Sequence, residues 1–448
     1  MIDAASEVPP PPSRRSRWFI LGYGAAQTGA FVCFIPLLTL LLPEKASMIG
    51  GADKAMLLSL AAMLGGATAA AANLMFGALS DRTRGRLGRR RPWILVGMAM
   101  AAASLTLLAF TRTPVQLILG VILFQVAVNA FYAPLTALVP DMVPDAQKGL
   151  ISAWAGAALP LANLFTVLVV SRLAGSTGAQ FAVVALAAGV LILPFALRLR
   201  EPPSGRPTSL RLSLTALRES RFRALFISRL LVETAVAINT LYLLFWAQGL
   251  RTGSTPAGWS ALDLFGVLLL VSTLAATVSG FAAGTLSDRW RGRRVFVIAG
   301  CAGMALAFAL MVGWPAWTGL LTAQLLFGAS HGVHAVAVAA MTAESLPDRT
   351  RAGRDLGVMN MAVAAPQSLA PAGAAVLLAL GLPLSAVFVL AGLAAIAGAL
   401  VLALDQTATG GRGGAVSPAA NCLSARSPAA VDDQRASGHQ ARCVGRQQ

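Results

Sequence analysis

The chain has 448 residues, of which 56% are hydrophobic and 12% are charged, and its formal net charge is +17. A soluble globular domain carries roughly 25% charged residues, so this composition excludes an ordinary water-soluble fold. The first segment, 1–16, is polar and rich in proline, and we expect it to lie in the cytoplasm. Apolar stretches that each suffice to cross a bilayer core of about 30 Å follow from residue 17 onward. The sequence therefore predicts an all-α membrane protein.

Twelve membrane spans are predicted, in two groups of six. They are 17–42, 55–80, 93–111, 114–139, 149–171, 178–197, 222–249, 261–286, 295–313, 316–342, 356–380 and 384–404. We accordingly expect a first six-helix bundle at 17–199, a cytoplasmic linker at 200–221 and a second bundle at 222–404. The remaining 405–448 has few large apolar residues, which predicts a disordered tail.

The positive charge is distributed unequally between the two sides of the membrane. With twelve spans, 29 of the 35 lysines and arginines fall on one side and 5 on the other, while Arg229 lies within a span. Basic loops stay in the cytoplasm, so we expect both termini inside the cell, with the chain in the plasma membrane. The most basic loop joins two spans, which argues against nucleic acid as a partner.

Two motifs occur twice, in the same order. The segment 77–90, GALSDRTRGRLGRR, is repeated as GTLSDRWRGRR at 284–294, and Asp81 corresponds to Asp288 at an offset of 207 residues. The segment 141–145, DMVPD, is repeated as ESLPD at 344–348, at an offset of 203. This repetition predicts two halves in parallel orientation, related by pseudo-symmetry. Such halves are typical of carriers that alternate access around a site at the membrane midplane.

The motif between the second and third spans resembles that of the major facilitator superfamily. Its fuller form, SDRTRGRLGRRRPW, is most similar to the glycoside–pentoside–hexuronide cation symporters and their sucrose-transporter-like relatives, and LPDRTRAGRDLGVMNMAVAAPQSLAP at 346–371 resembles the same branch. The resemblance covers about 17–404. It implies a secondary carrier that imports a small neutral solute, a sugar above all. We expect a monomer in the lipid bilayer.

The repeated motifs predict a conformational latch rather than a substrate site. Gly77 would allow another helix to approach closely, and Asp81 could accept from the N-terminus of a neighbouring helix. The resemblance implies that this neighbour is the eleventh helix. Arg82 and Arg86 are expected to pair with Asp141. The second half offers a mirrored set: Gly284, Asp288, Arg289 and Glu344. The alternative is that these residues serve topology and folding alone.

One acidic residue, Glu233, lies near the middle of a span, and Arg229 lies one turn earlier on the same face. Ionisable groups at this depth are costly and often functional, so a proton-binding carboxylate is one hypothesis and a permanent structural ion pair is the other. His331 and His334 share a face of the tenth span and could relay a proton. Their alternative is to fill the space between helices. We predict no metal site and no cofactor other than a coupling proton.

Uncharged polar residues within the spans are the substrate candidates. Amides both donate and accept hydrogen bonds, which suits hydroxyl groups, and an aromatic side chain can stack on a ring. The candidates are Tyr23, Gln27, Asn73, Gln125, Asn129, Trp154, Asn163, Asn239, Asn360 and Gln367. For each of them, the alternative is a hydrogen bond between helices.

The sequence also departs from the branch that it resembles. The cation-coupled relatives use acidic residues within the second and fourth helices, whereas here these spans have none before Asp81 and Asp141 at their ends. Sodium coupling is therefore not expected. An exporter of drugs or secondary metabolites on the same fold is the alternative function, and a membrane-embedded sensor is a third. No catalytic set or nucleotide-binding loop is visible, so we do not expect an enzyme or an ATP-driven pump.

Overall fold

The computed structural model describes residues 14–173, 176–201, 214–250, 256, 258–289, 292–345 and 352–405. Most of the predicted linker and nearly all of the predicted tail lie outside these residues. The described part contains eleven helical stretches long and apolar enough to cross a membrane, and one of them, Arg17–Arg82, has 66 residues. At 1.5 Å per residue, 66 residues would extend about 100 Å, some three times the bilayer core.

A turn near Gly51 divides this long stretch into two crossings. Gly51 has a φ of 53°, in the left-handed region that favours glycine, and it opens a short 3-10 turn, η2, Gly51–Asp53. The prediction of twelve membrane spans is thereby confirmed.

The helices fall into an N half and a C half. The N half contains α1 (Arg17–Pro36), η1 (Leu37–Leu41), α2 (Leu42–Gly50), α3 (Lys54–Arg82), α4 (Arg91–Ala109), α5 (Pro114–Met142), α6 (Asp145–Phe165), η3 (Thr166–Val170), η4 (Ser171–Leu173) and α7 (Thr177–Arg198). After η5 (Leu214–Arg218), the C half contains α8 (Ser220–Gln248), α9 (Ala261–Arg289), α10 (Arg293–Gly313), α11 (Trp317–Glu344), α12 (Ala352–Ala364), α13 (Pro366–Ala379) and α14 (Leu384–Leu404).

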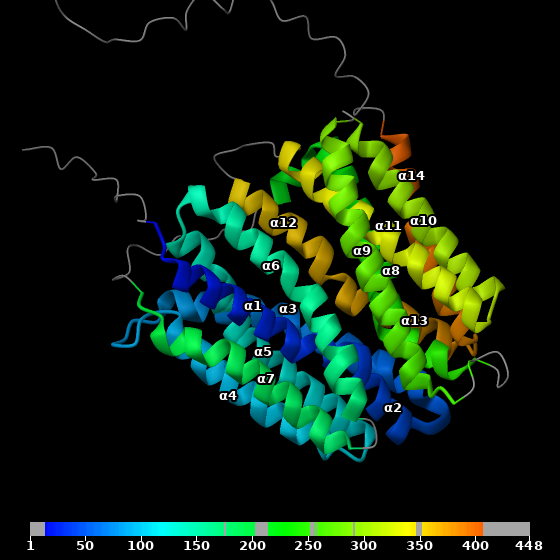
Figure 1. Cartoon of the computed structure of the whole chain (residues 1–448), viewed down its shortest axis with the longest axis horizontal. Helices are drawn as coiled ribbons and strands as arrows, with labels where there is room; N and C mark the ends of the chain where they lie inside the picture. Colours follow the sequence, from blue (N-terminus) through cyan, green and yellow to red (C-terminus); the bar gives the residue numbers. More distant parts are fainter. Residues whose placement is uncertain are drawn as a thin grey trace, which may run out of the picture. The chain divides into compact units, whose positions relative to one another are not determined.

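The two halves repeat one packing arrangement. In the N half, α5 packs against α3 and α4, while α7 packs against α1 and α4. In the C half, α11 packs against α9 and α10, and α14 packs against α8 and α10. The bounds of α9 are those of α3 displaced by 207 residues. Figure 1 shows the helices of each half gathered together, with the long apolar helices of each half running roughly alongside one another.

Glycines allow close helix contacts at equivalent places in the two halves. A Cβ atom on Gly97 of α4 would lie 2.5 Å from the backbone nitrogen of Phe131 in α5. A Cβ atom on Gly300 of α10 would lie 2.8 Å from the Cβ of His334 in α11. Both residue pairs are related by an offset of 203, so the repeat extends to individual contacts inside the bundles. Small residues at such crossings let helix backbones approach closely.

One pair of equivalent spans contains a proline in both halves. Pro160 lies inside α6, which continues into the π-helical segment η3. In the C half, α12 and α13 meet at Ala365 and Pro366, and Ala365 keeps helical dihedral angles, with φ −60° and ψ −39°. Because proline has no N–H group and its ring clashes with the preceding turn, it breaks the regular hydrogen-bond pattern of a helix.

The halves meet at several places in the described part of the chain. The largest contacts join α3 to α13, α6 and η3 to α9, and η1 to α8, and smaller ones join α2 and α3 to α8 and η4 to α9. The α3–α13 contact is the tightest among them. A Cβ atom on Gly66 would lie 2.5 Å from the Ser368 hydroxyl oxygen and 2.7 Å from the Gln367 carbonyl oxygen.

Candidate functional site

The two ends of the helical bundle differ in chemistry. At one end, α3, α5 and α11 terminate while α4 and α10 begin, and the repeated arginine motifs lie there. We name it the arginine-rich end. At the opposite end, the arginine-poor end, α3 and α9 begin and α8 terminates.

In the N half, a buried arginine joins the two acidic residues of the motifs. The Arg90 Nη2 atom lies 2.6 Å from Asp81 Oδ1 and 2.9 Å from Asp141 Oδ2. Its Nη1 atom donates to the Ser80 hydroxyl at 2.5 Å, and Arg89 also pairs with Asp141. A guanidinium group bound by two carboxylates is a strong, directional contact. This acid–arginine cluster ties the ends of α3 and α5 to the start of α4.

The arginines that bind Asp141 differ from those predicted. Arg82 and Arg86 are exposed, and Arg89 and Arg90 take their place. The physical reason is the turn at 85–88, where Gly88 has a φ of 93° and its N–H bonds the Gly85 carbonyl. This turn brings the start of α4 against α5, so the arginines that precede α4 reach the end of α5.

The C half repeats one of these pairs. Arg293 Nη1 lies 2.6 Å from Glu344 Oε1, in positions that correspond to Arg90 and Asp141. The side chains of Asp288 and Arg289 lie outside the described part of the chain. Gly284 lies in α9, where a Cβ atom would be 3.6 Å from Val336 of α11.

In this pose, Asp81 is bound within its own half and the space beside Gly77 is open. A Cβ atom on Gly77 would meet nothing within 4 Å. The predicted close approach at Gly77 and the predicted latch to a neighbouring helix therefore describe a different pose, in which the arginine-rich ends come together. The latch stays a prediction.

At the arginine-poor end, hydrogen bonds join the two halves directly. Lys54 Nζ donates to Gln248 Oε1 at 2.7 Å and lies 5.0 Å from the centre of the Phe245 ring. The Ser59 and Tyr242 hydroxyl oxygens are 2.5 Å apart. These contacts fix the start of α3 to the end of α8.

Two further contacts between the halves lie nearer the middle of the helices. Asn163 Nδ2 donates to Thr273 Oγ1 at 3.1 Å, joining α6 to α9. The second is the approach of Gly66 to Ser368. Each of these residues, like those at the arginine-poor end, lies in the arginine-poor half of its membrane span. The halves are thus joined toward one end, and the acid–arginine pairs lie at the other.

Amides proposed as substrate ligands form hydrogen bonds inside the N half. Asn73 Nδ2 donates to Asn129 Oδ1 at 3.1 Å, and Asn129 Nδ2 donates to the backbone carbonyl of Gln125, one turn earlier in α5, at 2.9 Å. Gln27 Nε2 donates to the Tyr132 hydroxyl at 3.4 Å, while the Gln27 Oε1 atom is buried with no partner among the described residues. These bonds link α1 and α3 to α5, and they leave part of the hydrogen-bonding capacity of the amides unused.

A matching pair of amides occurs in the C half. Gln324 Nε2 donates to Asn239 Oδ1 at 2.8 Å, and Asn239 Nδ2 donates back at 3.4 Å. Neither Gln324 nor Tyr132 is among the residues predicted from the sequence to bind substrate. The same signal would have found both, since each is a polar side chain in the middle of an apolar span.

Three of the candidate amides are exposed near the place where the halves diverge. Gln367 lies at the contact with Gly66. Asn73 and Asn360 lie seven residues from Gly66 and Gln367, respectively, toward the arginine-rich end, and seven residues return a helix to nearly the same face. All three amides are exposed. Asn73, Asn360 and Gln367 thus remain predicted substrate residues, and they are exposed on the helices that meet at Gly66.

The predicted ion pair within the C half is present but loose. Arg229 Nε lies 3.9 Å from Glu233 Oε1, and both side chains are about one-fifth exposed, at 23% and 20%. This distance is too long for a short, charge-assisted hydrogen bond. Glu233 is therefore not committed to a tight structural bridge in this pose.

The two histidines occupy different surroundings. His334 is buried at the α10–α11 contact, at the position that Phe131 has in the N half. His331 stacks on Phe327 of the same helix, with ring centroids 6.0 Å apart. A histidine that stands where the repeat has a buried phenylalanine favours a packing role for His334.

The aromatic candidates also differ. Tyr23 is buried, with its ring edge-on to Phe195 at 6.1 Å. Trp154 is 39% exposed, although its inner edge packs on Gly24 of α1, where a Cβ atom would lie 3.2 Å from the Trp154 Cβ. Trp154 is thus the aromatic candidate that retains a free surface.

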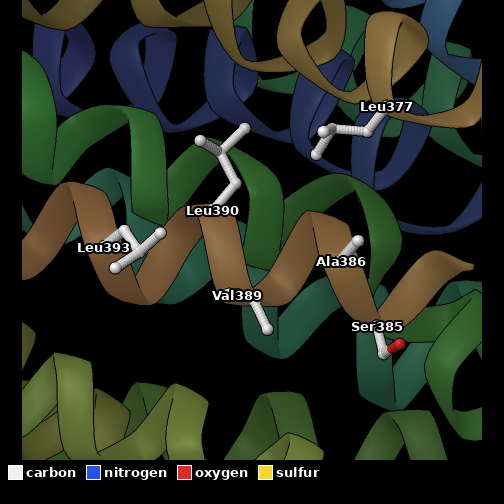
Figure 2. Close-up of a pocket in the computed structure, with 6 residues that line it drawn as sticks. All are labelled: Leu377, Ser385, Ala386, Val389, Leu390 and Leu393. Atoms are coloured by element: carbon white, nitrogen blue, oxygen red, sulfur yellow. The ribbon is translucent and has the colours of Figure 1, made fainter. Parts of the chain in front are cut away.

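An apolar groove of about 390 Å³ lies between α13 and α14, and none of the predicted substrate residues lines it. Figure 2 shows its lining side chains, Leu377, Ser385, Ala386, Val389, Leu390 and Leu393. Polar groups that would orient a hydrophilic solute are nearly lacking there, and Val389 and Leu393 are exposed.

Comparison with known proteins agrees with this architecture. The sequence profile of the Major Facilitator Superfamily matches residues 19–262 and 257–429. No curated protein sequence matches the chain significantly.

Solved transporter structures resemble the whole bundle. The nucleoside transporter NupG is 15% identical with a TM-score of 0.67, and the match covers 86% of this chain and 98% of that one. A mutant of the peptide transporter POT in complex with alafosfalin is 14% identical with a TM-score of 0.66, covering 86% and 93%. A POT family transporter in complex with 5-aminolevulinic acid is 11% identical with a TM-score of 0.64, covering 86% and 94%. At these identities, the likeness concerns the fold. With the profile matching nearly the whole helical part, the chain belongs to the Major Facilitator Superfamily and is an integral membrane transporter, not an enzyme.

Proposed function

We propose that this transporter moves a small neutral solute rich in hydroxyl groups, with sugars as the first class to test, by alternating access between its N and C halves. The polarity of the candidate site supports a neutral solute. Its exposed members are the amides Asn73, Asn360 and Gln367 and the indole of Trp154. Amides suit hydroxyl groups, which also donate and accept.

The position of the contacts between the halves is the observation that carries the proposal. Lys54 and Ser59 join α3 to α8 at the arginine-poor end, whereas Asp81 and Asp141 at the other end bind arginines of their own half. A carrier needs a second pose in which the arginine-poor end opens and the arginine-rich end closes. The repeated acid–arginine motifs supply groups that would join the halves there.

The direction of opening follows from the charge distribution. If the basic loops and both termini lie in the cytoplasm, the pose described here opens toward the cytoplasm. The solute would then enter from outside in the opposite pose and leave in this one. Coupling to a proton through Glu233 is part of the same proposal, since its carboxylate lies 3.9 Å from Arg229 and is partly exposed.

Uptake by purified protein in liposomes tests the function. The panel should contain hexoses, pentoses and disaccharides, together with a nucleoside and a dipeptide, each with and without an imposed pH gradient. We expect uptake of at least one sugar above that of protein-free liposomes, with saturation at high concentration. A Gly66→Trp variant is the matched control, because its side chain would push α3 away from Ser368.

Two results would contradict the proposal. Transport of only the nucleoside or the dipeptide would contradict the sugar class. Transport of hydrophobic drugs without any sugar, with resistance in cells that express the protein, would favour the exporter.

A further inference from the structure

The carboxylate of Glu201, which lies three residues beyond the end of α7, binds three successive backbone N–H groups at the start of α4. Arg89 N–H donates to Oε2 at 3.0 Å, Arg90 N–H donates to Oε1 at 2.8 Å, and Arg91 N–H donates to Oε1 at 2.7 Å. One side chain therefore satisfies three donors of a helix that begins at Arg91. The bonds connect residues 110 or more positions apart in the sequence.

The chemistry explains why an acidic residue occupies this position. The first N–H groups of a helix have no partner within the helix, and the aligned peptide dipoles give that end a partial positive charge. Arg90, the N-cap residue of α4, provides no side-chain cap of its own. Glu201 supplies the missing acceptor amid six arginines, at positions 82, 84, 86, 89, 90 and 91.

Gly88 leaves room for this carboxylate. A Cβ atom on Gly88 would lie 2.8 Å from Glu201 Oε1 and 3.0 Å from its carboxyl carbon. With a φ of 93°, the Gly88 backbone also adopts a conformation that other residues rarely adopt. The glycine in the motif thus serves the approach of Glu201.

Glu201 is bonded to the backbone of the same residues whose side chains form the acid–arginine cluster. Arg90 reaches Asp81 and Asp141, and Arg89 reaches Asp141. The carboxylate therefore fixes the backbone from which both arginine side chains extend. It also ties the first residues after α7, from which the connection to the C half departs, to the start of α4.

The C half also links the two equivalent elements, α10 and α14, but there the side chain at the start of the helix is the donor and backbone carbonyls are the acceptors. There, the Arg294 guanidinium at the start of α10 donates to the Leu402 and Ala403 carbonyls at the end of α14. In the N half, an acid that follows α7 accepts from the start of α4. Both halves thus fasten the same two spans together at the arginine-rich end. Only the N half does so through the residue that precedes the connection to the other half.

We propose that Glu201 is a positioning residue for transport, which holds Arg89 and Arg90 in place for Asp81 and Asp141 and anchors the connection between the halves at the same point. The role in transport rests on the proposed alternating access. The hydrogen bonds of Glu201 to the start of α4 do not depend on alternating access, so the bonds and the role in transport can be tested separately.

Lys45 provides a matched control at the other end of α4. It is 5% exposed, and its Nζ atom donates to the Ala109 carbonyl at 2.6 Å and to the Thr111 carbonyl at 3.1 Å. Lys45→Met would weaken the hold on α4 without touching the acid–arginine cluster. Comparing it with Glu201→Ala and Glu201→Gln separates general support of α4 from positioning of the arginines.

Hydrogen exchange of the purified full-length protein tests the bonds without any substrate. In Glu201→Ala, we expect amide exchange at residues 89–91 to rise by about tenfold or more, because hydrogen bonds to a charged acceptor are lost. Glu201→Gln keeps one acceptor oxygen and should fall between Glu201→Ala and the parent protein. Unchanged exchange in both variants would overturn the bonding.

A double-mutant cycle tests the positioning. Nitroxide labels at Leu150 and Leu404, exposed residues of α6 and α14, would report the separation of the arginine-rich ends in a cysteine-free background. If Glu201 acts through the arginines, Glu201→Ala should change the ratio of the two poses by about fivefold, and adding Asp81→Asn should bring little further change. Lys45→Met and Asp81→Asn should act additively.

Additive effects of Glu201→Ala and Asp81→Asn would refute positioning and leave only support of α4. Should Glu201→Ala fail to fold, Glu201→Gln takes its place in the cycle. If the parent protein shows no uptake, the proposed function fails, while exchange and the label distances still decide the role of Glu201.

Discussion

The Asp81 carboxylate lies 2.6 Å from the Arg90 guanidinium, and both groups belong to the N half. The carboxylate that a latch would use to hold the C half is thus already bound to an arginine of the N half. Asp81 remains 26% exposed, so one side of the carboxylate is open to a second partner. A latch on this residue would add a contact to a preformed cluster, which keeps the carboxylate oriented between one closure and the next.

Asp81→Asn is expected to slow transport without preventing insertion into the membrane. The amide cannot pair electrostatically with Arg90, nor attract the N-terminus of a helix as a carboxylate does. We expect uptake to fall about tenfold and cysteine labelling at the arginine-rich end to increase. Asp263→Asn is the control, since that carboxylate is exposed and binds Ser260 at the other end. Normal uptake with unchanged labelling would refute the latch.

Gly77→Ala and Gly97→Ala should distinguish a glycine predicted to allow contact between the halves from one that allows close packing inside the N half. Gly97→Ala forces a methyl group onto the Phe131 backbone, and we expect the free energy of unfolding in detergent to fall by about 1–3 kcal/mol. Gly77→Ala meets open space and should leave stability equal or higher, because alanine favours helix more than glycine does. If Gly77→Ala also leaves uptake unchanged, no close approach occurs there in either pose.

Removing hydrogen bonds at the arginine-poor end should reduce the population of the pose described here. A typical hydrogen bond contributes about 1 kcal/mol, so Ser59→Ala combined with Tyr242→Phe should shift the ratio of poses by about fivefold. Distances between spin labels placed across that end would measure the change. Thr106→Val is the control, because this exposed hydroxyl bonds only within its own helix, to the Ala102 carbonyl. An unchanged ratio would mean that apolar contacts alone close this end.

Glu233→Gln tests the coupling proton. If Glu233 carries it, the variant should lose uptake driven by a pH gradient while exchange of solute down its own gradient continues. The reason is that an amide neither binds nor releases a proton in this range. Glu219→Gln is the control, since Glu219 is exposed just before α8. Gradient-driven uptake that survives in Glu233→Gln would assign Glu233 to structure.

Helices and repeats could be predicted from the sequence because each leaves a direct trace in it. Span length follows from apolar runs, and the 207-residue offset between Asp81 and Asp288 reappears in the bounds of α3 and α9. Even the C-half ion pair Arg293–Glu344 falls where the 203-residue offset would place the equivalent of Arg90–Asp141.

The partners of individual side chains could not be predicted in the same way. Which arginine meets Asp141 depends on the turn at Gly88, and the motif contains six arginines within ten positions. Glu201 gave no signal, because a carboxylate beside a proline-rich linker does not indicate which helix end it will cap. A hydrogen bond between residues far apart in the chain leaves no pattern in the sequence, so such partners become visible only in the structure.

The paired prolines Pro160 and Pro366 have a mechanical consequence. Because proline has no N–H group to donate to the preceding turn, the same span lacks a backbone hydrogen bond in both halves and can bend more readily there. The change between poses then need not be a rotation of two rigid halves, since α6 and the α12–α13 span can also bend within their own halves.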